Sequence, residues 1–188
     1  GHRSEGIFRI SINSEDVDIY SRNFDRGQFS LPPRDPNYPA VLLKHYLRKL
    51  PEPLCPDYDA CIDFANHVPG AKTMHEIFSA LPQHNRDLLV YLADFIVRLG
   101  DASNVPYTKM EIAALCIVFV PAVLKCPVLD YAVALRNQAL EQRFMQDLIL
   151  WIRERKTAAS ASKEQASAAV AGGMKKRKSV LDMENANP

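Results

Sequence analysis

The chain has 188 residues, of which 47% are apolar and 24% are charged, and its formal net charge at pH 7 is +1. This length predicts one domain with a tail, and the apolar fraction is that of a globular protein with a sizeable core. The near-neutral charge excludes the bulk basic surface of proteins that bind nucleic acid, so no nucleic-acid partner is expected.

The four cysteines form no C-x-x-C pair and have no histidine at metal-ligand spacing, so neither a metal nor another cofactor is expected. Unpaired cysteines of this kind favour a reduced, intracellular compartment. The longest apolar run, residues 112–124, is too short to span a bilayer and is typical of a buried core helix. Stable membrane insertion is therefore not expected.

In chain order, the first signals are two helices separated by a proline-rich loop. A capping Asn13-Ser14 pair followed by acidic residues predicts a helix that runs to Asp25 and stops at Arg26-Gly27. Residues 28–39 contain four prolines and are expected to be a loop. The next helix begins near Pro39 and ends before the prolines that follow residue 50. Its predicted buried stripe is Leu43, Leu47 and Leu50.

Five further helices are expected, over residues 58–67, 73–81, 83–99, 109–120 and 130–155. The third of these should bury one face made of Leu88, Leu92, Phe95, Ile96 and Leu99. The fourth is apolar all round and should be central, and the last should turn inward Leu140, Phe144, Leu148 and Ile152. No stretch alternates with period two, so the predicted fold class is all-α, a helical bundle without a sheet.

After residue 155 the composition changes to alanine and serine with few large apolar side chains. Such a segment cannot bury enough surface to order itself, so residues 156–188 are predicted to be a disordered, low-complexity basic tail behind a domain of residues 1–155. The cluster Lys175-Lys176-Arg177-Lys178 in this tail is consistent with a nuclear import signal or a contact with anionic membranes, but also with a solvated charge run.

Motifs of self-contained active sites are absent. The sequence has no Gly-rich dinucleotide or phosphate loop, no G-x-S-x-G and no H-E-x-x-H. The protein is therefore not expected to be an enzyme by itself. Three cations stand out instead. Arg9 follows the apolar pair Ile7-Phe8, while Lys44 and Arg48 are four residues apart and share one helix face. Spacing alone favours a solvated surface for all three, with a partner-binding site as the alternative.

Four sequence motifs, in this order along the chain, favour the partner-binding site: EGIFRIS from Glu5, LLKHYLRKLPEPL from Leu42, LPQHNRDLLVYL from Leu81 and TKMEIAALCIVFVP from Thr108. Together they resemble a RhoGAP domain over residues 1 to about 153. The stretch SNVPYTKM is similar to the subgroup that carries a MyTH4 module ahead of this domain. The resemblance also implies helices before residue 1, so the domain is expected to be incomplete at its N-terminus.

The resemblance implies a helical GTPase activator that binds Rho/Rac/Cdc42-type small GTPases in the GTP state. Arg9 would be the arginine finger, Lys44 would contact the GTPase, and Arg48 would help hold the finger loop. A monomer acting in signal transduction and cytoskeleton control is expected. It would be cytoplasmic, with association to the cytoskeleton or membranes through the rest of the full-length protein.

Four positions depart from the family pattern, one of which is Lys49, where the family usually has glutamate. Ile12 stands where the family has a glycine after the finger, which questions the backbone geometry of the loop. Ala114 replaces an asparagine that faces the GTPase, and Ala122 replaces the asparagine that often follows the proline. Two functions therefore stay open: a GTPase activator working through Arg9, and a Rho-binding module with weak or no stimulation.

Overall fold

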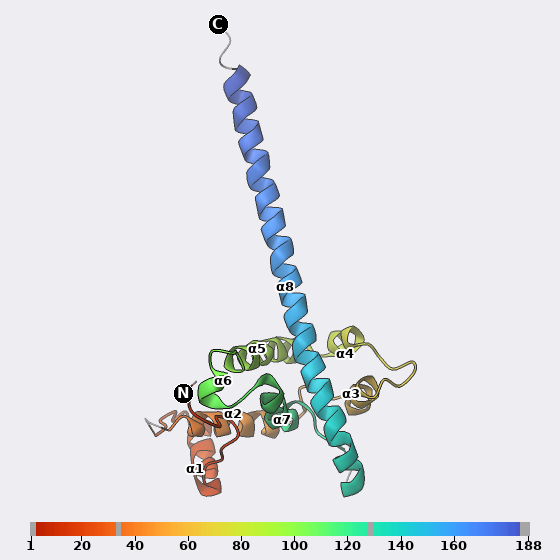
Figure 1. The fold of residues 1–188 in the computed structure, drawn as a ribbon. Coiled ribbons are helices and arrows are strands. Elements are labelled where there is room, and N and C mark those ends of the chain that lie inside the picture. Colours follow the sequence, from red (N-terminus) through yellow and green to blue (C-terminus); the bar gives the residue numbers. More distant parts are fainter. Residues whose placement is uncertain (1–2, 33–34, 128–129, 185–188) are drawn as a thin grey trace. The chain divides into compact units, whose positions relative to one another are not determined.

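The computed structural model describes residues 3–32, 35–127 and 130–184, with side chains through residue 161. Within these residues every regular element is a helix and none is a strand, which confirms the all-α class (Figure 1). The helices are α1 (Ser14–Asp25), α2 (Asn37–Lys49), α3 (Tyr58–Ala65), α4 (Met74–Ala80), α5 (Gln83–Leu99), α6 (Val105–Thr108), α7 (Ile112–Val123) and α8 (Tyr131–Glu184).

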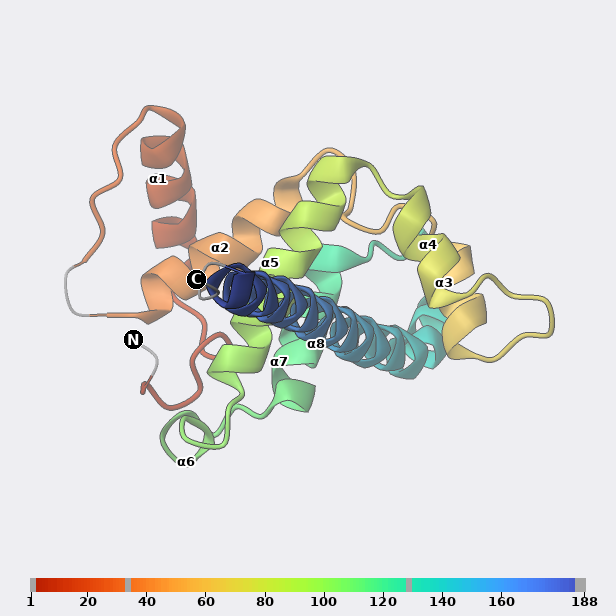
Figure 2. The same ribbon diagram turned by 90° about the horizontal axis from the view of Figure 1, so that it is seen from above.

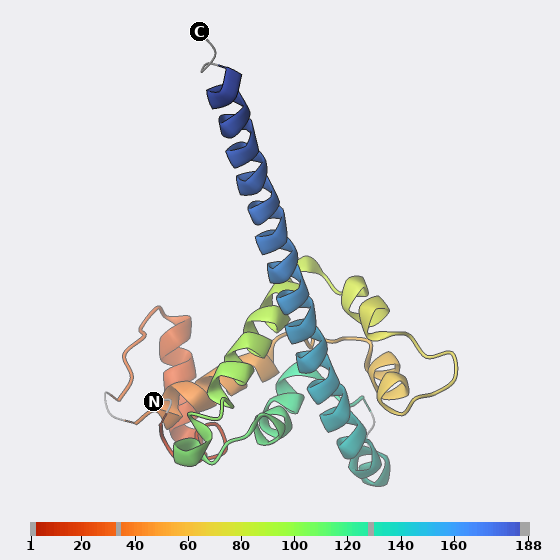
Figure 3. The same ribbon diagram turned by 45° about the horizontal axis from the view of Figure 1, so that its top comes forward.

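The chain divides into two units, residues 1–150 and residues 151–188, and the packing described below is that of the first unit. There α2 packs against both α1 and α7, and α7 also packs against α5 (Figure 2). The short helices α3 and α4 pack on each other, at the opposite end of this unit from α1 (Figure 3). The helix α7 is thus the central element, as its uniformly apolar sequence predicted.

Local capping explains the bounds of α1. The Asn13 side chain accepts a hydrogen bond from the backbone nitrogen of Glu15 at 3.1 Å, which satisfies one of the free N–H groups at the helix start. At the other end Gly27 adopts a φ of +76°, a conformation that glycine reaches without strain. Both ends agree with the prediction.

The buried face of α2 differs from the predicted leucine stripe. Leu43 is 38% exposed and Leu50 is half-buried, so of the three predicted residues Leu47 alone is buried. The residues that α2 does bury are Ala40, Leu42, Lys44 and Leu47. The reason is that α2 lies between α1 and α7 and therefore buries two sides. One of these sides consists of a small residue and the aliphatic stem of a lysine.

The bounds of α5 match the prediction from Gln83 to Leu99, and Gly100 caps its C-terminus. Leu92, Ile96 and Leu99 are buried as predicted, whereas Phe95 is half-buried and Leu88 is 36% exposed, with Leu89 buried in its place. Asn85, also buried, donates a hydrogen bond from Nδ2 to the Leu54 carbonyl at 3.0 Å and so ties α5 to the loop before α3.

The core of the first unit is centred on α7, where Leu115, Cys116 and Phe119 are fully buried. Pro121 lies in the last turn of this helix, where its missing N–H removes one bond, and the Leu124 nitrogen still donates to the Val120 carbonyl at 2.9 Å. One face remains open, since Ile117 is 46% exposed. The helix is therefore central as predicted, although its apolar surface is not buried on this face.

The remaining helices follow the predicted order. Thr73 and Glu76 form a reciprocal capping box at the start of α4. The short helix α6 was not predicted, because four residues are too few to show a periodic pattern. In the first unit α8 buries Phe144 and Leu148 as predicted and also Met145, whereas the predicted Leu140 is half-buried.

From residue 151 the backbone of α8 continues as helix to Glu184, across most of the segment predicted to be a disordered tail. Alanine has the highest helix propensity, which accounts for a helical backbone in a segment with few apolar side chains. The side chains of the basic cluster at 175–178 lie outside the described residues. The domain boundary at residue 155 and the tail's disorder stay predictions. Within the part of the chain that the structure describes, no helix is long and apolar enough to cross a membrane.

Gly100→Ala should destabilise the fold. An added Cβ would lie 2.6 Å from Cγ1 and 2.9 Å from the backbone nitrogen of Ile112, so the end of α5 and the start of α7 would have to separate. Overpacking of this kind costs about 1–3 kcal/mol. For a chain of this size that lowers Tm by roughly 2–10 °C, measurable by thermal unfolding. Ala102→Ser adds one atom at an exposed position of the same turn and should leave Tm unchanged. Equal Tm values for both variants would contradict this packing.

Candidate functional site

The loop at residues 4–10 places two apolar side chains inside the protein and one cation outside. Ile7 is 4% and Phe8 is 5% exposed, whereas Arg9 is exposed. The Phe8 ring packs against Phe95 of α5, with ring centroids 5.4 Å apart, and against Phe119 of α7 at 5.1 Å. Ile7 and Phe8 thus anchor the loop in the core, and Arg9 is left exposed to solvent.

The backbone of this loop forms a tight turn. Gly6, with a φ of +65°, donates from its nitrogen to the carbonyl of the buried Thr108 at 2.7 Å. The nitrogens of Arg9 and Ile10 both donate to the Gly6 carbonyl, at 2.8 and 2.9 Å. Thr108 was missed by sequence reasoning, since a long-range backbone contact leaves no pattern in the sequence.

Phe8 adopts a φ of +70°, which is unfavourable for a residue with a side chain. Such a conformation costs about 1–2 kcal/mol, and the burial of the aromatic ring offsets that cost. Ile12 does not have a positive φ, so the position where the family has glycine needs no glycine in this chain. The departure from glycine at position 12 therefore does not require a different backbone geometry of the loop.

Lys44 of α2 is buried, at 7% exposure, and its Nζ donates to the Phe8 carbonyl. Burial of the ammonium lowers the pKa of Lys44, and the nearby positive charge of Arg48 lowers it further. No ion pair with a carboxylate is recorded for Lys44 among the described residues. A desolvated cation is thus held here by a neutral carbonyl of the loop, which fixes the residue immediately before Arg9.

Arg48 lies one turn further along α2 and is exposed. In the described residues no hydrogen bond or ion pair joins it to the loop. The resemblance implied that Lys44 contacts the partner and Arg48 holds the loop. In the structure the contact with the loop is made by Lys44 instead, and Arg48 is the cation that remains accessible.

Ala114 and Ala122, the two positions where the family has asparagine, differ in their surroundings. Ala114 on α7 is half-buried and precedes the exposed Ile117 by one turn, so its side chain borders the open face of the helix. Ala122 is 2% exposed and belongs to the core. The expectation that both alanines remove polar contacts from a docking face is therefore wrong for Ala122.

The site has the chemistry of a docking surface. Arg9 and Arg48 offer exposed guanidinium groups, which bind carboxylate or phosphate oxygens in a bidentate manner. Within the described residues no group of three His, Cys, Asp or Glu side chains could hold a metal ion.

Lys44→Met should change how stability depends on pH. Because the pKa of Lys44 is lowered from its usual 10.5 in the folded protein, the unfolded chain binds this proton more tightly. Stability of the wild type should therefore rise, relative to Lys44→Met, as the pH increases through the folded pKa towards 10.5. Denaturant unfolding at about pH 7 and about pH 10 measures the difference.

Lys125→Met is the matched control, because Lys125 also donates to a carbonyl, that of Leu50 at 2.8 Å, but is exposed. This control should follow the wild-type pH profile. If Lys44→Met follows it too, the ammonium of Lys44 is not desolvated in solution.

A family model described as the RhoGAP domain matches residues 1–128. GTPase activating protein homolog 3 from Dictyostelium discoideum is 34% identical over 150 residues, which cover 78% of this chain and 11% of that protein. Rho GTPase-activating protein 22 from Mus musculus is 32% identical over 158 residues, 79% of this chain and 22% of that protein. The chain thus spans about a tenth to a fifth of the length of these curated relatives.

Solved structures support the same fold. The BH domain of the GTPase regulator associated with focal adhesion kinase superposes with a TM-score of 0.64 at 23% identity, covering 82% of this chain and 85% of that one. Human Rho GTPase activating protein 15 superposes with a TM-score of 0.58 at 21% identity, covering 78% and 74%. The finer assignment to the MyTH4-containing subgroup stays a prediction. On the match over residues 1–128, the chain belongs to the RhoGAP domain family.

Proposed function

We propose that this domain accelerates GTP hydrolysis by a Rho-family small GTPase in its GTP state, with Arg9 as the arginine finger. The observation that carries the proposal is the contrast within one tripeptide: Ile7 and Phe8 are buried while Arg9 is exposed. The names of relatives such as Rho GTPase-activating protein gacHH from Dictyostelium discoideum, 36% identical over 149 residues, support this class of partner.

The chemistry required of Arg9 is electrostatic. In GTP hydrolysis, negative charge is spread over the oxygens of the transferred phosphoryl group, and a guanidinium supplied by a second protein stabilises it. Such a finger accelerates hydrolysis by roughly 10³ to 10⁵, on the order of 4 to 7 kcal/mol of transition-state stabilisation. A loop already held by Phe8 and Lys44 loses little conformational freedom on docking, so more of the binding energy remains available.

One observation supports the second function, a Rho-binding module with weak or no stimulation. Ala114 borders an exposed face of α7 and lacks the amide that the family places there. A domain without that contact could bind a Rho-type GTPase and stimulate it weakly or not at all. Signalling through the cytoskeleton, a cytoplasmic location and a monomeric state are further proposals that rest on the resemblance.

Arg9→Ala should abolish stimulation and change the affinity for a GTP-loaded Rho-type GTPase by no more than a few-fold. The expected rate loss is about 10³-fold or more, because the transition-state charge is then uncompensated. Arg9→Lys should also be poor, since an ammonium lacks the planar fork. Single-turnover hydrolysis with several Rho-type GTPases measures the rate, and binding to a non-hydrolysable GTP complex measures the affinity.

Arg22→Ala removes an exposed arginine of α1 outside the site and should retain full stimulation. Full stimulation by Arg9→Ala would show that Arg9 is not the finger. If the wild-type domain binds the GTPase but does not stimulate hydrolysis, the second function is favoured.

Lys44→Met and Arg48→Ala should have different effects. Lys44→Met frees the carbonyl before Arg9, so the rate within the bound complex should fall while affinity changes little. Arg48→Ala removes an accessible charge, so affinity and its salt dependence should weaken while the rate at saturation is kept. Saturation curves of stimulated hydrolysis at two salt concentrations separate the two parameters. If Lys44→Met lowers the affinity and Arg48→Ala lowers the rate, the two residues have the roles that the resemblance implied.

Ala114→Asn should raise stimulation. One regained hydrogen bond contributes about 0.5–1.5 kcal/mol net, which corresponds to a gain of about two- to tenfold. Because Ala114 is half-buried, the amide can reach solvent and Tm should change little. Ala113→Asn, one residue earlier and exposed, is the control and should leave the rate unchanged. A drop in Tm without a gain in rate would mean that position 114 is enclosed by the core.

A further inference from the structure

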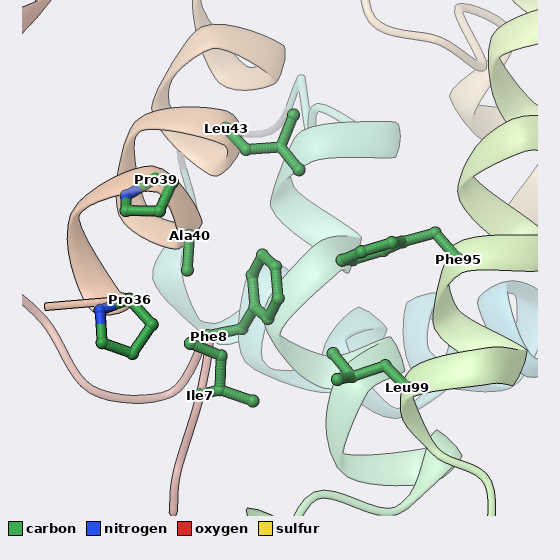
Figure 4. Close-up of a pocket in the computed structure, with 8 residues that line it drawn as sticks. All are labelled: Ile7, Phe8, Pro36, Pro39, Ala40, Leu43, Phe95 and Leu99. Atoms are coloured by element: carbon green, nitrogen blue, oxygen red, sulfur yellow. The ribbon is translucent and has the colours of Figure 1, made fainter. Parts of the chain in front are cut away.

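The apolar anchor of the finger loop acts at Ile7 and Phe8. Figure 4 shows the Phe8 side chain between Ala40 on one side and Phe95 and Leu99 on the other. The residues just before this pair have no comparable anchor, because residues 3 and 5 are exposed and residue 6 is a glycine without a side chain. We call residues 3–6 the entry segment, and another part of the chain has to fix its position.

The helix α6 lies beside the entry segment and makes two contacts with it (Figure 3). The Gly6 nitrogen donates to the Thr108 carbonyl at 2.7 Å. The guanidinium carbon of Arg3 lies 4.9 Å from the centroid of the Tyr107 ring, within the range of a cation–π interaction. Two consecutive residues of α6 thus hold the backbone and one side chain of the entry segment.

The way in which α6 ends makes the Thr108 carbonyl available to Gly6. The last carbonyls of a helix have no N–H partner within that helix. At Lys109 the backbone turns to a φ of +55° and the helix stops. Thr108 is fully buried, and its hydroxyl oxygen accepts from the Met110 nitrogen at 3.2 Å. An unpaired carbonyl at such a position would be costly, so the bond from Gly6 stabilises both segments.

Gly6 connects α6 with Arg9. Its nitrogen is bonded to Thr108, and its carbonyl accepts from the nitrogens of Arg9 and Ile10 at 2.8 and 2.9 Å. A displacement of Gly6 would therefore disturb the hydrogen bond that holds the Arg9 backbone. These contacts lead without interruption from α6 to the residue whose side chain is exposed at the site.

Tyr107 is the exposed part of this arrangement. Its ring is 51% exposed, so it contributes little to the core, and within the described residues no hydrogen bond of its hydroxyl is recorded. Over the same part of the chain Arg3 has no carboxylate at ion-pair distance. The Tyr107 ring is therefore what holds the Arg3 side chain, and it can be removed without opening the core.

We propose that Tyr107 is a positioning residue for Arg9, which holds the entry segment through Arg3 and so keeps the hydrogen bond between Gly6 and Thr108 closed. This inference rests on the proposed function of Arg9 and adds a second restraint to the one that Phe8 provides. Loss of the Tyr107 ring loosens the loop where it enters the site and leaves the anchor in the core unchanged.

The contact is tested first without any GTPase, by amide hydrogen exchange of Gly6 and Arg9, followed by NMR on the full chain. Tyr107→Leu removes the ring and should speed the exchange of both amides by about two- to fivefold, the factor expected for the loss of an exposed cation–π contact. Tyr107→Phe keeps the ring and should exchange like the wild type. Tm should be unchanged in both variants, because the ring is exposed.

Tyr131→Leu is the control, because it removes an equally exposed tyrosine ring at the start of α8 and should leave both exchange rates unchanged. Wild-type exchange rates in Tyr107→Leu would overturn the proposal. Equal exchange in Tyr107→Phe and Tyr107→Leu would overturn it as well, since the hydroxyl and not the ring would then hold the loop.

The same contact can be removed from its other side. Arg3→Leu should speed exchange as much as Tyr107→Leu does, and the double variant should exchange no faster than either single variant, because both lose one shared interaction. If the two effects multiply, Arg3 and Tyr107 act separately, and the proposed route from Tyr107 to the loop is wrong.

The positioning role is read from saturation curves of stimulated hydrolysis. Tyr107→Leu should lower the rate at saturation by up to the factor seen in exchange, with the half-maximal concentration unchanged, and Tyr107→Phe should restore the rate. A raised half-maximal concentration at an unchanged rate would mean that Tyr107 contacts the GTPase instead, and an unchanged curve would also overturn the role. If the wild type stimulates no GTPase, the proposed function fails, and the exchange rates still decide whether Tyr107 holds the loop.

Discussion

The burial of the Phe8 ring between Phe95 and Phe119 is the interaction on which the position of Arg9 depends. An exposed arginine by itself is mobile, since its long side chain has several rotatable bonds. Here the backbone one residue earlier is held by an aromatic anchor in the core, and the turn around Gly6 fixes the backbone on the other side. The domain thus presents a flexible cation on a restrained backbone.

Lys44 shows what this restraint costs. A buried ammonium that meets only a neutral carbonyl is less favourable for folding than a hydrophobic residue of similar size would be. The lowered pKa of Lys44 reflects that cost, because burial disfavours the charged form. A charge kept in such surroundings is better explained by the loop that it holds than by stability. In the proposed function, its positive charge beside the Phe8 carbonyl would also favour the docking of an anionic partner.

Much of the fold could be predicted because its signals are local. Caps, prolines and glycines mark helix ends, so Gln83 and Leu99 were correct bounds for α5 and Asn13 the correct cap for α1. Burial was predicted less well. The leucine pattern assigned Leu43 and Leu88 to the core, yet both are exposed, because which face is buried depends on neighbouring helices that sequence periodicity does not describe.

The site shows the same limit. The exposed Arg9 beside the apolar pair Ile7-Phe8 could be recognised in the sequence, whereas the carbonyl that Lys44 contacts could not, since thirty-six residues separate the partners in sequence. The polarity of a residue also predicts the burial of lysine poorly, because its aliphatic stem can be buried while its ammonium contacts a single acceptor. Ala114 and Ala122 look equivalent in sequence, and their burial alone separates them.

The central helix α7 connects the two halves of the proposed site. Phe119 on its buried face supports the finger anchor, and Ala114 borders its open face. Five residues of α-helix correspond to a rotation of about 140°, so the two positions point in nearly opposite directions from one rigid element. A change at Ala114 can therefore alter contacts with a partner without disturbing the ring that positions Arg9. In the proposed function, this separation means that the missing asparagine would affect docking and leave the position of Arg9 unchanged, which favours an activator with reduced affinity over an inert binding module.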